Sequence, residues 1–323
     1  MKIHFFTLTI LIVLFSSCSV KDAEEIKYNY ITIYSDSKTD NDSLIFRKFE
    51  KEEKIKVRFR YIPSDSILYT IKTEKFNSEA DLILLSNYNL LKKASRKKLF
   101  LPIKSTVLEK NIDPIYHSTQ NHWFGLSKTP LVVICHKNVL SKDRIKNYHE
   151  LIKPEWKNKI SLQEKNNQTM KYFENNIRFL LKIKADTFLT KLEKQSFLPR
   201  SGDDFKQIER VKNGETIFSI VKLSSLAESH FKYDTTNEKN TQKVQAIFPN
   251  QRKKGCFMAI SGGGVHRYAR NPQNAQKMLE FLSSNRAQYK YAEKRYEFPI
   301  SKDVNPCFEL EKFKKFRGRL YKY

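Results

Sequence analysis

Glycine is scarce in this sequence, with 8 among 323 residues, or about 2.5% where roughly 7% is usual. Because glycine alone tolerates left-handed backbone and very close backbone contact, the few that remain should mark positions that need one or the other. Three are consecutive, Gly262, Gly263 and Gly264. We expect them to form a tight turn after a strand at Phe257–Ile260. A phosphate-binding loop is the alternative, although the run lacks the lysine and the following Ser or Thr of that motif.

Catalytic motifs are also missing. The sequence contains no GxSxG, HExxH, CxxC, GxxxxGK[ST] or GxGxxG pattern. Its seven histidines are scattered. Four cysteines, at 18, 135, 256 and 307, show neither a disulfide framework nor a zinc spacing. We therefore expect a protein that is not an enzyme.

The N-terminus predicts export. Lys2 precedes an apolar run from Phe5 to Phe15 that is too short to span a bilayer comfortably, and Leu14-Phe15-Ser16-Ser17-Cys18 resembles a lipobox. We predict a signal peptide at 1–17, lipidation of Cys18 and a polar tether at 18–29, which would anchor the protein in the cell envelope on a periplasmic or outer membrane face. Ordinary signal cleavage, giving a freely soluble secreted protein, is the alternative.

A large positive charge would ordinarily suggest nucleic-acid binding. The formal net charge is +25, but lysine outnumbers arginine 45 to 15. Arginine is the better fork for phosphate, so this bias favours an AT-rich genome over a selected phosphate-binding surface. Because export would also remove the chain from the cytoplasm, we expect no nucleic-acid partner.

Hydrophobic patterning predicts an α/β fold. We expect strands at Ile31–Tyr34, Ile55–Tyr61 and Ala80–Leu85, with an amphipathic helix at Asp42–Glu53 whose Leu44, Ile45, Phe46 and Phe49 point inward. Alternating strands and helices in this order indicate a parallel βαβ sheet. Later segments show the same hydrophobic patterns, which predict strands at 131–135 and 216–221 and helices at 204–213 and 272–284.

The order of these segments resembles the ferric-ion-binding solute receptors of ABC importers. The matching segments run in register along the chain. They are ITIYSDSKTD, EKEEKIKVRF, EKFNSEADLIL, LPIKS, WFGLSKTPLVV, ELIKPEWKNKI, GDDFKQIERVKNGE, FPNQRKKGCFMAISGGGVHRYARNPQNAQKMLEFL and RAQYKYAEKRYEFPI. The resemblance covers residues 30 to about 310, and the segments at 146–160 and 248–300 are the most specific.

This resemblance implies a two-lobed periplasmic binding protein of type II, the Venus flytrap fold, with the ligand cleft between the lobes. We expect lobe 1 to comprise 30–130 plus 250–300, lobe 2 to comprise 131–249, and a C-terminal tail at 301–323 to pack on the lobes. It also implies an importer permease and ATPase as partners, and a monomer.

The resemblance fails at the positions that hold iron in the family. There, tyrosinates, a histidine or carboxylate and a bound anion surround the hard ferric ion. The histidine and tyrosine of the first loop fall on Lys38 and Thr39, and the carboxylate after the third strand falls on Ser86. We therefore expect ferric iron to lose its usual ligands here, and Lys38 to repel a cation.

The remaining family positions have changed as well. The paired tyrosines fall on Ser224 and Ser225, a further tyrosine on Cys135, and the anion-binding arginines on Thr129 and Leu131. Each position has a structural alternative. The two serines could begin a helix, and Cys135 could be a buried strand residue. Asp203 and Asp204, outside these positions, could cap a helix or contact the ligand.

Hydrogen-bond donors with one positive charge remain, and they suit a neutral polar or anionic ligand, including a ferric chelate. The predicted cleft residues are Lys38, Thr39, Ser86, Asn87, Thr129, Cys135, Ser224 and Ser225. For metal, only Tyr34 and Tyr88 are weak candidates. Two alternatives stay open, a true Fe3+ receptor with a rearranged ligand set and a surface lipoprotein that uses the fold for adhesion or partner contact.

Overall fold

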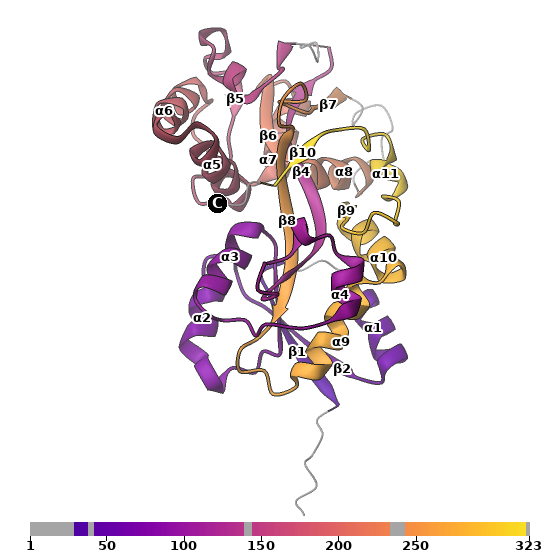
Figure 1. Cartoon of the computed structure of the whole chain (residues 1–323). Coiled ribbons are helices and arrows are strands. Elements are labelled where there is room, and N and C mark those ends of the chain that lie inside the picture. The colour runs from indigo at the N-terminus through magenta and orange to yellow at the C-terminus, as the bar shows by residue number, and fades with distance from the viewer. Residues whose placement is uncertain (1–28, 38–41, 139–143, 233–242, 321–323) are drawn as a thin grey trace, which may run out of the picture.

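A computed structural model describes residues 29–37, 42–138, 144–232 and 243–320 (Figure 1). The predicted signal peptide, Cys18, most of the tether, Lys38 and Thr39 lie outside these residues. No helix in the described ranges is long and apolar enough to cross a membrane.

The lower lobe of Figure 1 is built on a parallel sheet flanked by helices. β1 (Tyr30–Ser35) pairs in parallel with β2 (Lys56–Tyr61) and with β3 (Leu82–Leu85), which confirms the predicted βαβ order. The helices of this lobe are α1 (Asp42–Glu53), α2 (Ile67–Glu74), α3 (Tyr88–Arg96), α4 (Thr106–Asn111), α9 (Pro272–Ser283) and α10 (Asn285–Arg295). Short 3-10 turns occur at Lys75–Asn77 and Pro114–Tyr116.

The helix predicted at Asp42–Glu53 is confirmed with the same bounds. Ile45, Phe46 and Phe49 are buried as expected. The prediction that Leu44 points inward is wrong, because 53% of its surface is exposed. Ile45 and Phe49 lie four positions apart on one face of the helix, and Leu44 lies to one side of that stripe.

The upper lobe combines short strands with helices on both sides. Its strands are β5 (Ile160–Ser161), β6 (Phe218–Lys222) and β7 (Val244–Ile247), and its helices are α5 (Gln168–Leu181), α6 (Ala185–Gln195), α7 (Asp204–Lys212) and α8 (Leu223–Lys232). Among the described residues of this lobe, 3-10 turns also occur at Tyr148–Ile152, Pro154–Trp156 and Lys182–Lys184.

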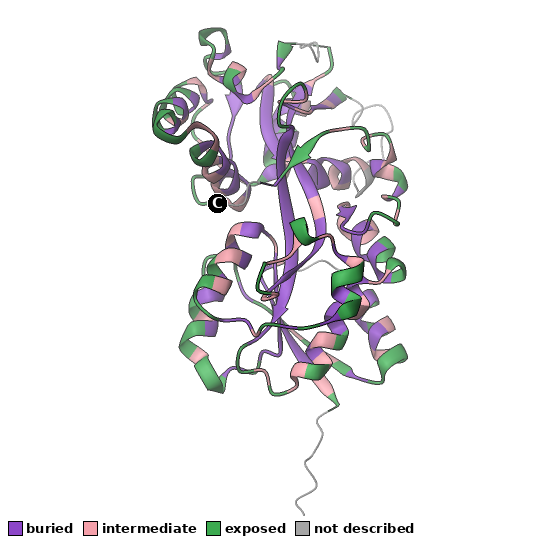
Figure 2. Ribbon diagram, in the orientation of Figure 1, coloured by how far each residue is buried: buried purple, intermediate pink, exposed green. Residues whose placement is uncertain are grey.

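Two long antiparallel strands run between the lobes (Figure 1). β4 (Phe124–His136) rises from the lower lobe to the upper, and β8 (Cys256–Val265) returns. They join both sheets into one path, β2-β1-β3-β8-β4-β6-β5. Every residue of β8 is buried (Figure 2). The chain is therefore interwoven, as the sequence predicted.

The glycine run lies inside β8 and forms no turn, so the predicted turn is wrong. Gly262, Gly263 and Gly264 pair with β3, and Gly262 and Gly263 also pair with β4. A Cβ on Gly262 would collide with the carbonyl oxygen of Phe124, and one on Gly264 with that of His122. Glycine is needed here for close approach of neighbouring backbone, and none of the three has a positive φ.

After α10 the chain packs first on the strands shared by the lobes and then on the upper lobe. β9 (Phe298–Pro299) pairs with β4, α11 (Phe308–Glu311) lies beside α8, and β10 (Gly318–Arg319) pairs with β8. Buried Cys307 and Leu310 share an apolar cluster with residues of α7 and α8. The lobe bounds of 30–130 plus 250–300 and 131–249 remain a prediction.

Candidate ligand site at the facing edges of the lobes

Strand direction places two sheet edges opposite each other. The last residue of β3, Leu85, pairs with Gly262, which lies nearer the upper lobe than Val265, the partner of Leu82. The last residue of β6, Lys222, pairs with Leu131 near the middle of β4. Both strands therefore end toward the other lobe, which is where open α/β sheets bind ligands.

The lower edge, defined as Asp36, Ser37, Ser64, Ser86 and Asn87, is organised by the Asp36 carboxylate. Ser86 donates its backbone N–H to Oδ1 and its hydroxyl to Oδ2, both at 2.7 Å. Ser64 donates its hydroxyl to Oδ2, also at 2.7 Å. Only 6% of the Asp36 surface is exposed, and burial raises the pKa of its carboxyl, while these hydrogen bonds work against that rise.

Asn87 begins a helix on the same edge. Its side-chain oxygen accepts the N–H of Leu90 at 3.0 Å and so caps α3. Tyr88 follows in the first turn, where its ring packs edge-on against Trp123 with centroids 5.6 Å apart. The positive end of the α3 dipole therefore lies at the lower edge, where it favours the negative charge of Asp36, the acceptor of the Ser86 N–H.

Arg295, the last residue of α10, contacts the lower edge. Its Nη2 donates to the Ser37 hydroxyl at 2.8 Å, and its Nη1 lies 3.2 Å from the Asp42 carboxylate. Its Nε lies 3.8 Å from Glu297. Arg295 therefore contacts Ser37 and Asp42, the described residues on either side of positions 38–41.

The upper edge, defined as Gln163, Thr169, Asp204, Lys222, Ser224 and Ser225, is organised by the Asp204 carboxylate. Oδ2 accepts the hydroxyls of Thr169 at 3.1 Å and Ser225 at 3.0 Å, and the N–H of Lys222 at 3.0 Å. Gln163 donates to Oδ1 at 2.9 Å. Asp203, not Asp204, caps α7 by accepting the N–H of Lys206 at 3.1 Å.

Thr129 connects β4 to this edge. Its Oγ1 accepts the N–H of Ser224 at 3.1 Å, and only 2% of the residue is exposed. The helix begins at Leu223, so Ser224 and Ser225 lie in its first turn, and neither serine is the N-cap that the alternative interpretation expected. A threonine 95 positions away in sequence provides this hydrogen bond.

The remaining predicted residues lie in packed positions. Cys135 is fully buried in β4, between Phe218 of β6 and Gln245 of β7, in the core of the upper lobe. Tyr34 is also buried, and its hydroxyl accepts a hydrogen bond from Arg60 at 2.9 Å. Burial raises the pKa of Tyr34 and of Tyr88, which opposes the proton loss that a tyrosinate ligand requires.

The structure therefore brings Ser86 and Asn87 to one edge, and Thr129, Ser224 and Ser225 to the other. Sequence reasoning missed Asp36, and for Asp204 it weighed helix capping against ligand contact. A signal existed for Asp36, because it directly follows a buried parallel strand and so stands at the carboxyl end of the sheet. Among the described residues, no group of three or more His, Cys, Asp or Glu side chains could hold a metal ion.

Comparison with known proteins identifies the family. The model for bacterial extracellular solute-binding proteins matches residues 45–315, so the chain belongs to that family, whose members are binding proteins and not enzymes. Iron uptake protein A1 of Synechocystis sp. (strain ATCC 27184 / PCC 6803 / Kazusa) is 28% identical over 299 residues, which cover 89% of this chain and 80% of that protein.

Solved structures share the two-lobed periplasmic fold. A Trichodesmium protein in complex with iron and citrate superposes with a TM-score of 0.82 at 29% identity, covering 90% of this chain and 92% of that one. A ferric binding protein from Campylobacter jejuni gives 0.85 at 25% identity, covering 89% and 92%. The predicted fold class is thereby confirmed.

Proposed function

We propose that this protein is the solute receptor of an ABC-type importer and that it binds a ferric chelate or another polar anionic ligand between its lobes, in place of bare Fe3+. The observation that carries the proposal is the chemistry of the two edges. Most of their described side chains are hydroxyls and amides organised by Asp36 and Asp204, and the described residues contain no group of three or more His, Cys, Asp or Glu side chains that could hold a metal ion. An importer permease and ATPase would be its partners.

The hydrogen bonds refine which ligand groups would fit. A hydroxyl has one proton to donate, and Ser86 and Ser225 both give theirs to an aspartate. Toward a ligand they therefore offer acceptor lone pairs. Thr129 accepts from a backbone N–H and keeps its proton. A ligand with both hydroxyl and carboxylate groups, or a metal chelate of one, matches this mixture better than a simple anion does.

The names of similar proteins favour iron in some form. One relative is an iron uptake protein, and one similar structure contains iron and citrate. We therefore choose ferric citrate as the first ligand to test. A true Fe3+ receptor with a rearranged ligand set is the second candidate, supported by the same names. A surface lipoprotein without transport is the third, and it would bind no such ligand.

Thermal unfolding of chelator-stripped protein tests the proposal. A ligand at 100 times its dissociation constant should stabilise the folded state by about 2.7 kcal/mol. We expect ferric citrate to raise the melting temperature without producing a strong visible tyrosinate-to-iron absorption band. A strong band at one equivalent would support the bare-iron receptor instead. No shift with ferric citrate, citrate or phosphate would contradict the receptor proposal.

Two variants locate the ligand. Ser224→Ala removes a hydroxyl from the upper edge, and we expect it to weaken ligand binding severalfold. Thr106→Ala removes an exposed hydroxyl from the start of α4 and should leave binding unchanged. Equal binding by both variants and the parent would exclude Ser224 as a contact.

We also propose that Cys18 carries the lipid that anchors the mature chain. The supporting feature is the lipobox-like sequence Leu14-Phe15-Ser16-Ser17-Cys18 after a short apolar run. Cell fractionation of a Cys18→Ala variant checks this. The parent should remain with the membranes and the variant should leave them.

A further inference from the structure

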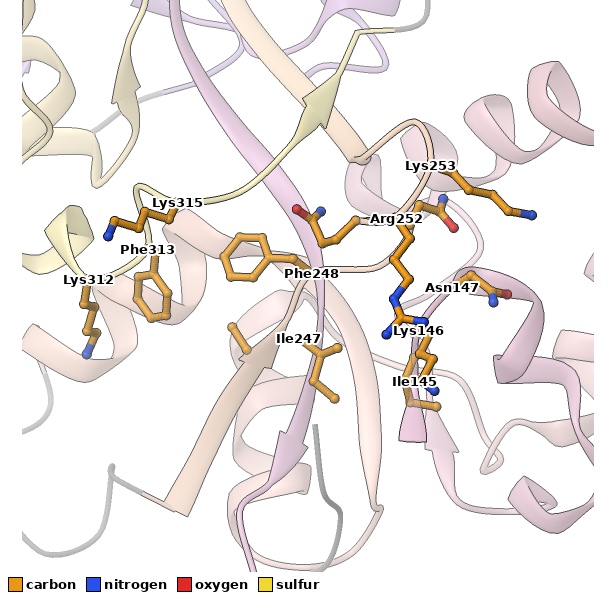
Figure 3. Close-up of a pocket in the computed structure, with 13 residues that line it drawn as sticks. Ile145, Lys146, Asn147, Ile247, Phe248, Arg252, Lys253, Lys312, Phe313 and Lys315 are labelled. Atoms are coloured by element: carbon orange, nitrogen blue, oxygen red, sulfur yellow. The ribbon is translucent and has the colours of Figure 1, made fainter. Parts of the chain in front are cut away.

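A cavity lies in the upper lobe, and it shares no residue with either facing edge. It has a volume of about 670 Å3, within the range of small-molecule sites. Its walls come from residues 145–147, from the end of β7 with the turn that follows, and from residues 312–315 after α11 (Figure 3). These three segments are far apart in sequence.

The floor of this cavity is apolar. Ile145, Ala246 and Ile247 line it, together with the rings of Phe248 and Phe313. The two rings lie 6.0 Å apart, and Phe248 also stacks on Phe316 with centroids 4.9 Å apart. An aromatic or acyl body would therefore find apolar contact on several sides.

The rim carries charge of one sign. Lys146, Arg252, Lys253, Lys312 and Lys315 line the cavity, and none of its described lining residues is Asp or Glu. Within the described part of the chain, none of these five forms an ion pair with a carboxylate. Burial lowers the pKa of Lys312, and the nearby charge of Lys137 lowers it further. Such a rim attracts anions and repels metal cations.

The walls are tied together before any ligand arrives. The N–H of Asn250 donates to the carbonyl of Lys146 at 2.8 Å, which joins the turn after β7 to the first wall. Gln251 donates to the carbonyl of Arg317 at 2.9 Å and accepts the N–H of the same residue at 2.6 Å, which joins the turn to the C-terminal segment. A cavity held in this way loses little conformational freedom on binding.

We propose that this cavity binds a small amphiphilic organic anion, with an apolar or aromatic body on Phe248 and Phe313 and an acidic group at Arg252 and Lys146. Figure 3 shows the Arg252 side chain extending toward Lys146, while Lys253 extends away from them. The size of the cavity favours a small molecule over a segment of a protein partner. The proposal does not depend on the ligand between the lobes.

Two fluorescent probes with one ring system test both halves of the proposal. Anilinonaphthalenesulfonate carries an anionic sulfonate, and N-phenylnaphthylamine is its uncharged counterpart. We expect the sulfonate to bind with at least about tenfold higher affinity, since a charge-assisted hydrogen bond is worth roughly that factor. Dodecanoate should displace it. Equal affinity for the two probes would overturn the anion preference.

A charge-matched pair of variants places the probe. Lys146→Gln/Arg252→Gln removes two charges from the rim, and Lys104→Gln/Arg267→Gln removes one exposed lysine and one exposed arginine from the lower lobe. The first should weaken sulfonate binding about tenfold and reduce its salt dependence, while the second should match the parent. Circular dichroism melts confirm that both variants fold. Loss of affinity in both, or in neither, would overturn the site.

Discussion

The two facing edges differ in how a buried aspartate is hydrogen-bonded. Each is organised by one buried aspartate, Asp36 below and Asp204 above. Asp36 receives three hydrogen bonds from only two residues, Ser64 and Ser86, which follow β2 and β3. Asp204 receives four, from four residues that lie in two stretches of the upper lobe, 163–169 and 222–225. The upper aspartate therefore satisfies more donor groups than the lower one does.

The hydrogen bonds at each edge also determine which ligand groups that edge could bind. At the lower edge, both polar hydrogens of Ser86 go to Asp36, so that serine offers acceptor oxygen beside a carboxylate. At the upper edge, Thr129 keeps its proton, since its oxygen accepts the N–H of Ser224. A ligand between them would turn its donors or its metal toward the lower edge and its acidic groups toward Thr129.

The largest expected effect is the loss of folding stability when each carboxylate is removed in turn. Asp204→Ala leaves four donors without their acceptor, three of them in buried residues, and we expect it to lower the free energy of unfolding by roughly 3 to 5 kcal/mol. Asp36→Ala should cost less, about 1 to 2 kcal/mol, because it also relieves the burial of a charge. Urea unfolding measures both.

An exposed aspartate supplies the control for this pair. Asp186 pairs with Arg178 on the surface, with 79% of its side chain exposed, so Asp186→Ala should change stability by less than about 1 kcal/mol. If Asp36→Ala proves as costly as Asp204→Ala, the proposed difference between the edges is wrong.

These contacts also show what the sequence could predict. Local pattern predicted β1, α1 and the βαβ order, because the spacing of Ile45, Phe46 and Phe49 and the apolar run of β3 lie within single segments. The hydrogen bond from Ser224 to Thr129 spans 95 positions and that from Ser86 to Asp36 spans 50, so no local pattern contains them. The glycine run was misread for the same reason, because its partners are β3 and β4.

The next largest effect should come from the strand that both lobes share. Gly262→Ala would drive a Cβ into the carbonyl oxygen of Phe124 and force β8 away from β4, at about 2 to 3 kcal/mol. Gly214→Ala is the control. Its φ of +76° is strained for alanine, but no atom lies within 4 Å, so it should cost only about 1 kcal/mol. Thermal unfolding compares them, and equal losses would show that β8 tolerates separation from β4.

The smallest expected effect is the pH dependence of stability that comes from Asp36 at the lower edge. Burial raises the folded-state pKa of Asp36 above its unfolded value near 3.8, so the folded state binds this proton more tightly than the unfolded state does. The resulting stability is present below that unfolded value and declines as pH rises through the folded-state pKa. Asn at this position accepts the Ser86 N–H but never ionises. Asp36→Asn should therefore gain stability relative to the parent, by less than about 1 kcal/mol, as pH rises from about 4 to 7. Melting temperatures across that range test this, with the exposed Asp303→Asn as control.

Parallel pH profiles for Asp36→Asn and the parent would mean that Asp36 ionises as readily in the folded chain as in the unfolded one. The lower edge would then carry its negative charge without penalty, and a metal facing that edge would be favoured more strongly than a neutral donor group.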